Sequence, residues 1–438
     1  MGKKTTLFML LTAMLLCCFP LEAKAGQASI DVSRLPNYNF TERTGQTSGD
    51  GWSWDGAKRQ LTLKGAVIYS TFDNVRLPDG TEIILQEGSD NYIVTQNGSY
   101  NNGLFSDGDI TIKGTGRLYI DSGIGIQCAG QCRIEGADVS ITAIYTGVSA
   151  HSFVQDSGKL SIRSKGSAIE GQTVTINGGR LFLDGLLSGI STKDMVINKG
   201  TVDISTISMG IQIFGGQLVI NDGMLKIDTL NMGMHAFMGI NLYQPEAQMI
   251  MHGGQAVITA SGVAVFGSTY STQMPAKPRL IMDGGEMRLT GQTAVELESP
   301  ASDVQKMTDK NFPQPSTIIQ LSQGVQPAEQ VQTGRVLETD QADDGQTVGW
   351  YVYGFVQDDQ LASSVTLKAQ MDTMTTGKCT TQNESTQQDR APEDIIVARL
   401  TPEQMEAIRK AAAERGQDAG DFANEATLEE LIYYGILK

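Results

Sequence analysis

Hydrophobic and polar residues alternate in short runs between residues 109 and 300, and glycine-containing turns separate the runs. One phrase recurs there with small changes, as ITIKGTGRLYI, CRIEGADVSI, DSGKLSI, VTINGGRLFL, MVINKGTVDI, LVINDGMLKI, MIMHGGQAVI and LIMDGGEMRL. Alternation with a period of two is typical of β-strands, because successive side chains of a strand point to opposite faces. The pattern therefore predicts strands and excludes helical repeats of the ankyrin or tetratricopeptide type.

Copies of this phrase follow one another at intervals of about 22 residues, and the last two intervals lengthen to about 31. A second phrase follows each copy, as GIGI, TGVSA, GSAIE, SGIST, MGIQI, MGMHA, SGVAV and TAVEL. A fixed period of this size is the signature of a solenoid, whose repeats stack and bury a common core. We therefore predict an all-β protein, a right-handed parallel β-helix with coils of about 22 residues.

Segments outside the repeat differ from it in composition. The last forty or so residues carry helix-start signals, with Thr401 as an N-cap and Pro402 at the first helical position. The predicted organisation is a signal peptide 1–25, an N-terminal segment and cap 26–60, the β-helix 61–300, a connection 301–335, a small β-unit or C-terminal cap 336–375, a flexible linker 376–395 and a helical hairpin tail 396–438. We expect the tail to dock on its own chain, with a protein partner as the alternative.

The N-terminus has the features of a secretory signal. Lys3 and Lys4 precede an apolar run that is too short to span a bilayer comfortably, and Ala23 and Ala25 supply a small-x-small cleavage signal. No other stretch of the sequence is long and apolar enough for a transmembrane span. We therefore predict a secreted protein, extracellular or at the cell surface.

The net charge of the chain is −16. Such a surface repels nucleic acid and tolerates or recruits cations such as calcium. The alternative interpretation is an ordinary acidic surface that keeps a secreted protein soluble.

Trp52 and Trp54 lie one residue apart in an alternating segment, so both can point to one face. A solenoid must cover the open end of its core, and large aromatic side chains suit that task. We interpret the pair first as a hydrophobic lid over the first coil and second as an exposed sugar-binding platform.

Two further groups of residues invite a structural interpretation. Cys128 and Cys132 lie close enough in IQCAGQC for a disulfide in an oxidising compartment, with two free thiols as the alternative and a zinc site disfavoured. Asn177, Asn198 and Asn221 precede the glycine turn in three consecutive coils, which predicts an internal structural ladder whose amides satisfy backbone groups.

Oxygen-rich turns are the candidate metal sites. The segment FSDGDITI places Asp107 and Asp109 around a glycine, and EGSDNYIV places Asp90 beside an asparagine. Hard cations use such ligands, and ordinary turns use the same residues. Outward strand positions show no recurring acid pair of the kind that a glycoside hydrolase needs, although carboxylates of different coils can still meet in the stack.

The succession GWSWD, QLTLKGA, LPDGTEIILQEGSDNYIV and GLFSDGDITIKGTGRLYI, followed by glycine turns such as INGG, resembles the secreted clostridial and gut-bacterial β-helix proteins grouped as calcium-containing carbohydrate-binding domains. The resemblance covers roughly residues 50 to 300. It implies a fold like that of polysaccharide lyases and binding of plant cell-wall polymers such as polygalacturonate without cleavage. On that basis Asp107 and Asp109 are the best candidates for calcium ligands.

The two longer coils contain the segments NMGMHAFMGINLYQPEAQ and GSTYSTQMPAKP. Extra loops on one side of a solenoid are where binding specificity is commonly built. Tyr243 and Tyr270 are therefore candidate sugar-stacking residues, with plain loop tyrosines as the alternative.

These observations together predict a secreted protein that binds acidic, uronate-containing polysaccharide without catalysing a reaction. Calcium bridges between carboxylates and uronates would hold the polymer, supported by aromatic stacking. The first alternative is a polysaccharide lyase or glycoside hydrolase on the same fold. The second is a surface adhesin or structural spacer whose C-terminal helices bind a protein partner.

Overall fold

The computed structural model describes residues 38–70, 75–95, 101–229, 237–244, 246–268, 279–304, 307, 312–341 and 346–369. The chain divides into two compact units, residues 1–372 and 373–438, and every described residue belongs to the first unit. The predicted signal peptide, the linker 376–395 and the helical hairpin 396–438 therefore lie outside the described residues.

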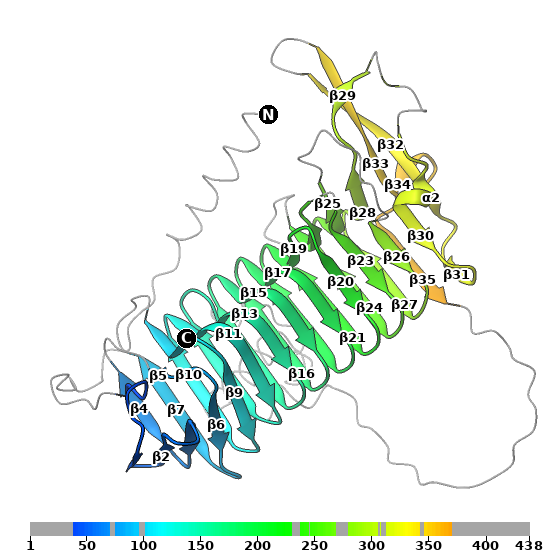
Figure 1. Ribbon diagram of the computed structural model, residues 1–438. Helices are drawn as coiled ribbons and strands as arrows, with labels where there is room; N and C mark the ends of the chain where they lie inside the picture. Colours follow the sequence, from blue (N-terminus) through cyan, green and yellow to red (C-terminus); the bar gives the residue numbers. More distant parts are fainter. Residues whose placement is uncertain are drawn as a thin grey trace, which may run out of the picture. The chain divides into compact units, whose positions relative to one another are not determined.

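The described part is built almost entirely from β-strands, so the all-β prediction is confirmed (Figure 1). A 12-stranded sheet contains β4 (Val67–Ser70), β7 (Asp90–Thr95), β10 (Arg117–Ser122), β12 (Asp138–Ala143), β14 (Lys159–Ser164), β16 (Arg180–Gly185), β18 (Thr201–Thr206), β21 (Met224–Thr229), β24 (Gln255–Thr259), β27 (Glu286–Thr290), β31 (Val325–Pro327) and β35 (Ser364–Ala369).

A 23-stranded sheet contains the other strands. They are β1 (Gln46–Gly49), β2 (Trp52–Asp55), β3 (Gln60–Leu63), β5 (Val75–Leu77), β6 (Thr81–Leu85), β8 (Asn102–Ser106), β9 (Ile110–Gly114), β11 (Ile124–Glu135), β13 (Val148–Gln155), β15 (Ser167–Ile176), β17 (Ser188–Ile197), β19 (Met209–Ile213), β20 (Gln217–Ile220), β22 (Met238–Leu242), β23 (Gln248–Met251), β25 (Val263–Gly267), β26 (Leu280–Met282), β28 (Thr293–Glu298), β29 (Ser302–Asp303), β30 (Ile319–Leu321), β32 (Gln332–Gln341), β33 (Thr347–Gln357) and β34 (Gln360–Leu361). A short helix, α2 (Pro315–Ile318), precedes β30.

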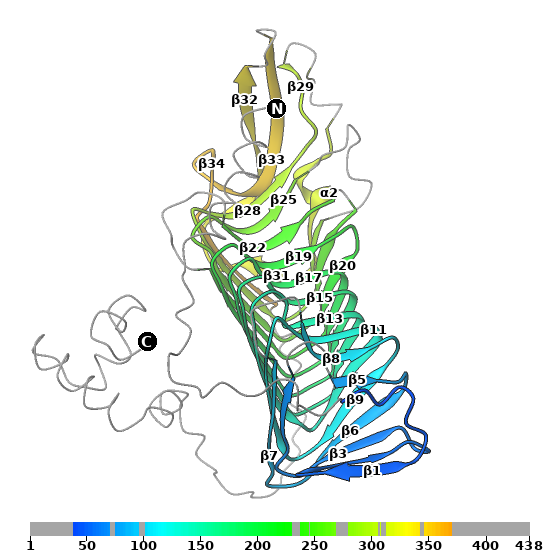
Figure 2. The ribbon, with the colours of Figure 1, turned by 90° about the vertical axis from the view of Figure 1, so that its left-hand side faces the viewer.

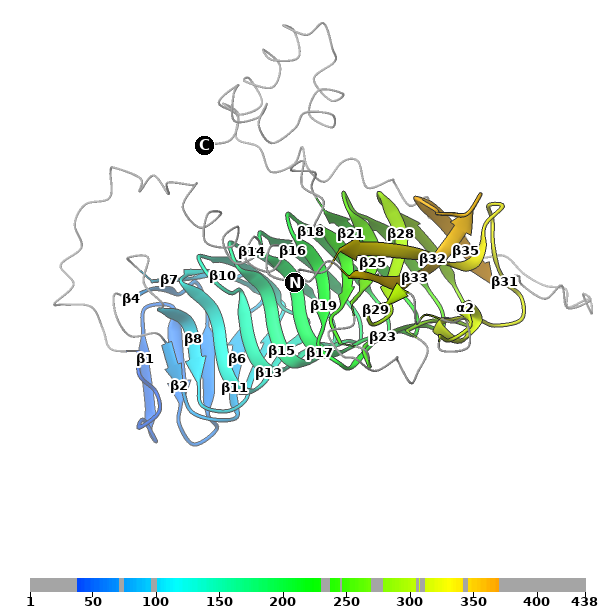
Figure 3. The same cartoon turned by 90° about the horizontal axis from the view of Figure 1, so that it is seen from above.

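From β4 to β27, successive strands of the 12-stranded sheet are parallel and in register, and the chain visits the 23-stranded sheet between them (Figures 2 and 3). Leu181 of β16 pairs with Val202 of β18, and Val202 pairs with Leu225 of β21. These residues are fully buried, and so are the alternate positions Leu183 and Ile204 to within 2 %. The alternation in the sequence therefore supplies one continuous apolar core.

Glycine recurs at the turns that lead into the parallel strands of this sheet, and Gly200 shows the reason. Gly200 has a φ of 90°, in the left-handed region that side chains rarely adopt, and a Cβ there would lie 2.6 Å from the carbonyl oxygen of Gly179. The recurring glycine thus reflects both backbone conformation and the close approach of the preceding coil.

A buried arginine links the two longer intervals of the sequence. The guanidinium of Arg279 donates to the carbonyl oxygens of Leu242 at 2.6 Å and Gln244 at 2.9 Å. Burial lowers the pKa of Arg279 to about 10. The backbone on both sides of Tyr243 is thereby fixed.

One strand was misplaced in the sequence analysis. The residue of the next coil that pairs with Met209 of β19 is Met238 of β22, so the copy of the second phrase is MGINL rather than MGMHA. The segment MGMHA itself lies outside the described residues. The chain here inserts residues before it resumes the stack, and periodicity cannot locate the end of an insertion.

The N-terminal end of the core is covered by an antiparallel β1, β2 and β3, of which β3 pairs in parallel with β6. Trp54 is only 2 % exposed, and its indole N–H donates to the carbonyl oxygen of Arg43 at 2.8 Å. The rings of Trp52 and Trp54 both pack on Phe40, with centroids 5.5 and 5.0 Å away. The pair thus forms the hydrophobic lid, and the buried Trp54 cannot serve as a sugar platform.

The C-terminal end also contains strands where a connection was predicted. Within residues 301–335, β30 pairs in parallel with β26 and so extends the stack. Farther along, β33 and β35 pair antiparallel with β28 and β27. Among the described residues of the predicted small β-unit, β33 and β35 therefore lie against the last repeat strands and cover part of their edges.

Candidate functional site: a groove on the 23-stranded sheet

The groove arises where long strands of the 23-stranded sheet interrupt their alternation. In β15, Ser167, Ala168 and Ile169 are all buried, whereas the following residues Glu170 to Thr173 all have some exposure. The register between β11 and β13 shifts at the corresponding place, between Cys128 and Gln131. Consecutive exposed residues mean that these strands bend, and the bend hollows the surface.

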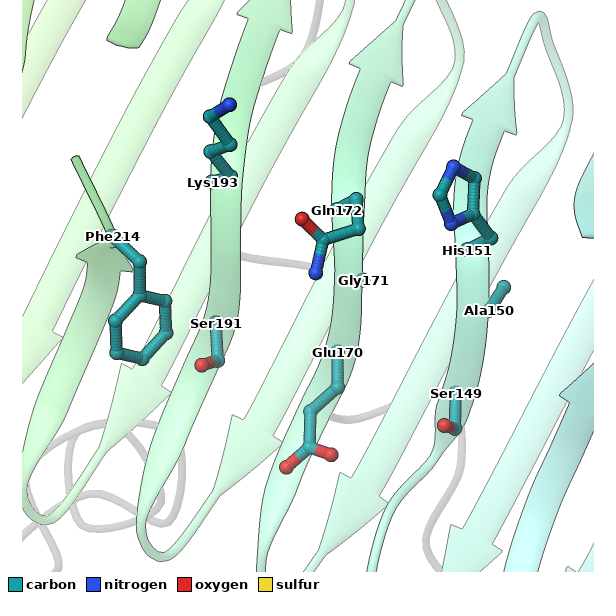
Figure 4. Close-up of a pocket in the computed structure, with 9 residues that line it drawn as sticks. All are labelled: Ser149, Ala150, His151, Glu170, Gly171, Gln172, Ser191, Lys193 and Phe214. Carbon is teal, nitrogen blue, oxygen red and sulfur yellow. The ribbon is translucent and has the colours of Figure 1, made fainter. Parts of the chain in front are cut away.

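The resulting groove is open to solvent and has a volume of about 560 Å³. Figure 4 shows the residues that line it, on neighbouring strands and at the end of β19: Ser149, Ala150, His151, Glu170, Gly171, Gln172, Ser191, Lys193 and Phe214.

Polar side chains line the groove in two rows. In the first row Ser149 pairs with Glu170, and Glu170 pairs with Ser191 on the next strand. In Figure 4 the second row consists of His151, Gln172 and Lys193, all three of which are exposed. Hydrogen-bond donors and acceptors therefore recur from strand to strand, at a spacing of about 4.8 Å.

Small residues separate the two rows. A Cβ on Gly171 would lie 2.6 Å from the carbonyl oxygen of Ala150 on the preceding strand. A larger side chain at position 171 would therefore force the strands apart and fill the groove. Glycine at this place is required by the close approach of the backbone.

An aromatic pair closes one end of the groove. The ring of Phe214 is 36 % exposed, and Tyr243 packs edge-on against it with centroids 5.5 Å apart. Tyr243, a candidate sugar-stacking residue from the sequence, thus lies beside the groove behind Phe214. Tyr270, the other candidate, lies outside the described residues.

The predicted calcium ligands are not brought together as a site. Asp109 accepts a hydrogen bond from the backbone N–H of Gln131 at 2.7 Å, and Asp90 is paired with Arg117 at 2.9 Å. Asp107 is exposed. Within the described ranges, no three His, Cys, Asp or Glu side chains cluster in a manner that could hold a metal ion.

The asparagine ladder is present, but it lies at the surface and bonds to itself. The amide of Asn198 donates to Asn177 at 2.8 Å, and the amide of Asn221 donates to Asn198 at 2.7 Å. Asn177 in turn donates to Asp156 at 2.7 Å. The prediction of an internal ladder bonded to the backbone was therefore wrong in its partners, because these side chains leave the turn on its outer side.

Cys128 and Cys132 are both free and buried in this structure, so the disulfide suggested by their spacing is not formed. Both lie on β11, around the bend of that strand. A hydrogen bond with Cys128, together with complete burial, raises the pKa of the Cys132 thiol well above its usual value. The pair is part of the core.

Comparison with known proteins gives one finding. A family model described as "Carbohydrate-binding domain-containing protein" matches residues 52–210. This span contains every groove residue except Phe214, which follows it. No curated protein and no solved structure shows a significant match to the chain. No helix among the described residues is long and apolar enough to cross a membrane.

The groove residues themselves were missed in the sequence analysis. His151, Glu170 and Lys193 carry no motif of their own, and their neighbours in the sequence are ordinary repeat positions. A signal did exist, since alternation fails around Gly171 in the run SAIEGQTVTI. Such a failure marks a bend in a strand, and bends are places where solenoids form concave surfaces.

Proposed function

We propose that this protein binds carbohydrate in the groove of the 23-stranded sheet. The observation that carries the proposal is the row formed by Ser149, Glu170 and Ser191, one polar group per strand, ending at the exposed ring of Phe214. Sugar hydroxyls need such donors and acceptors, and the apolar face of a pyranose packs on an aromatic ring. The match of residues 52–210 to a carbohydrate-binding family supports the same conclusion.

We further infer that the ligand is an acidic, uronate-containing polysaccharide. Lys193 and His151 are the two ends of the second row, and an ammonium group can pair with a uronate carboxylate. Glu170 would then accept hydrogen bonds from sugar hydroxyls. A groove that crosses several strands suits a polymer better than a small molecule, because successive strands offer polar groups to successive sugar units.

The finer predictions from the sequence belong to this proposal. We propose a parallel β-helix, for which the parallel, in-register strands give support, and export directed by residues 1–25. Calcium dependence stays a prediction.

A glycan array tests the proposal directly. The protein is screened with added calcium and with chelator, and each bound glycan is analysed for cleavage products. We expect retention of uronate polymers without products, and a loss of about tenfold in affinity for Phe214→Ala and for Lys193→Ala. Lys226→Ala is the control, because Lys226 lies on β21 and is not among the residues that line the groove. Retention of no glycan would refute the proposal.

Product analysis also addresses the enzymatic alternative. Glu170 shares the groove with His151 and Lys193, which are residue types that act as acids and bases. Unsaturated ends among the products would indicate β-elimination, and new reducing ends without unsaturation would indicate hydrolysis. In either case Glu170→Gln should abolish product formation while leaving the polymer bound.

A further inference from the structure

A second group of outward side chains follows one column of the 12-stranded sheet, away from the groove. Tyr92 of β7 pairs with Tyr119 of β10, and the same column continues through Ser140, Ser161 and Phe182 on β12, β14 and β16. The residues directly before and after a column member in the sequence, such as Leu118 and Ile120 around Tyr119, are buried. The column therefore faces outward, and Figure 3 shows β10, β14 and β16 on a different side from β13, β15 and β17.

The two tyrosines form a preorganised aromatic surface. Their rings are stacked, with centroids 4.9 Å apart and planes at 12° to each other, and Tyr92 is 40 % exposed. Val67, the residue that pairs with Tyr92 on β4, is 49 % exposed. Two rings that hold one another in place lose little conformational freedom when a ligand packs against them.

The following residues leave room beside this stack. Ser140 and Ser161 are too short to cover the ring of Tyr119, and their hydroxyls can bond to a ligand. Phe182 resumes the aromatic surface three strands farther on, at about 14 Å for a spacing of about 4.8 Å. The column therefore has aromatic rings at both ends and two serines between them. The distance from Tyr119 to Phe182 is that of two or three sugar rings.

Basic side chains accompany this part of the column. The ammonium of Lys159 lies 5.7 Å from the ring centroid of Phe182, and Arg180 is exposed on the next strand. The two lie in the neighbouring outward column, whose earlier members are Arg117 and Asp138. Arg117 forms an ion pair with Asp90. In a chain of net charge −16, a local pair of cations beside aromatic rings and hydroxyls is complementary to an anionic sugar.

We propose that the column from Tyr92 to Phe182 is a second carbohydrate-binding surface, which takes a uronate-bearing saccharide. It rests on the proposed function in that its ligand is of the same chemical class. Because the groove and this column belong to different sheets, one chain would hold two polymer strands and link them. Such bivalence raises the apparent affinity for a polymer without any new contact.

Calorimetric titration of the full chain with a short oligogalacturonate tests the proposal. We expect two ligands per chain for the native sequence. The double variant Tyr92→Ala, Tyr119→Ala should bind one, with the affinity of the groove unchanged. The groove variant Phe214→Ala, Lys193→Ala should also bind one, and combining all four changes should abolish binding.

Each other outcome is decisive. A double tyrosine variant that still binds two ligands overturns the second surface. One ligand in the native chain, lost in the groove variant, overturns the second surface and leaves the proposed function standing. One ligand in the native chain, lost only in the tyrosine variant, refutes the groove and supports the column. No binding at all overturns both.

Matched variants separate loss of the surface from loss of folding. Tyr92→Phe with Tyr119→Phe retains the rings and should retain both ligands, and thermal melting followed by circular dichroism checks each variant. Lys159→Gln should weaken binding at the column about tenfold and reduce its dependence on salt. Its control is Lys226→Gln, because Lys226 lies in the column of Phe182 but two strands beyond it. Equal affinity of Lys159→Gln and the native chain would overturn the acidic specificity of this surface.

Discussion

The two sheets are built from the same repeat, yet they present different surfaces. In the 12-stranded sheet, β10, β12, β14 and β16 each have six residues and pair residue for residue. In the 23-stranded sheet, β11, β15 and β17 have 12, 10 and 10 residues and bend midway. The first sheet keeps its alternation intact, and the second does not.

This difference has a physical consequence for ligand binding. Unbroken alternation places one outward side chain above the next, so that like residues stack, as Tyr92 and Tyr119 do. A bend places two rows of side chains around a hollow, as in the rows of Glu170 and Gln172. One repeat can therefore provide a stacking surface on one sheet and a groove on the other, and five changes test how far the two are independent.

The largest loss of stability is expected from a change in the core that both sheets share. Ile204 of β18 is fully buried, and Ile204→Ala would leave a cavity and cost about 2–5 kcal/mol of unfolding free energy. Urea denaturation measures this loss. Thr259→Ala, exposed on β24, is the control and should stay within about 0.5 kcal/mol. A loss below about 1 kcal/mol for Ile204→Ala would contradict a tightly packed shared core.

Arg279→Met should act mainly on the 23-stranded sheet. It leaves the carbonyl groups of Leu242 and Gln244 without their buried donor, and we expect a loss of about 2–4 kcal/mol. Sugar affinity should fall as well, because Tyr243 between them supports Phe214. Arg288→Met removes a surface ion pair with Glu286 and should leave stability nearly unchanged, because solvent screens the pair. Unchanged sugar binding in Arg279→Met would show that the hydrogen bonds of Arg279 do not support the groove.

Gly171→Val tests the bend itself. The new side chain would approach the carbonyl oxygen of Ala150 and occupy the groove, with an expected loss of about 1–3 kcal/mol and of sugar binding there. Binding at the column of Tyr92 should persist. Gly45→Ala, at an open position, is the control. Simultaneous loss of both binding surfaces would show that the sheets are not independent.

Asn198→Ala breaks the ladder in its middle. It removes the bonds to Asn177 and Asn221, and we expect a loss of about 0.5–1 kcal/mol, since surface hydrogen bonds exchange with water. Chemical denaturation of this variant and of Lys199→Ala, at the exposed neighbouring position, measures the difference. Equal midpoints would mean that the ladder reflects turn geometry alone.

The smallest expected effect is on the stability of the protein at low pH. Lys113 lowers the pKa of Glu82 from its ordinary value of 4.5, chiefly by a hydrogen bond and by its charge. The ionised form is thereby favoured in the folded state, so the contribution to stability is present above pH 4.5 and is lost as the pH falls through the lowered value. Glu82→Gln should remove this part of the acid sensitivity in a comparison of melting temperatures. An unchanged pH profile would show that solvent screens the pair.

Predictions from the sequence succeeded where the cause was local. The alternation around Leu181 and Leu183, the turn at Gly200 and the lid formed by Trp52 and Trp54 depend on residue type and period. They failed where a residue's partners come from another coil. Asn198 was expected to bond to the backbone, but its amide donates to Asn177 of the preceding coil.

The sequence by itself determined the all-β class, the repeat and the covered N-terminal end, because period and composition act along the chain. Only the tertiary structure decided the site. His151, Gln172 and Lys193 are about 21 residues apart and become neighbours only because each coil is laid beside the last. Phe214 and Tyr243 meet across a longer coil for the same reason. Stacking converts separation along the chain into adjacency, and the order of residues within one coil does not reveal it.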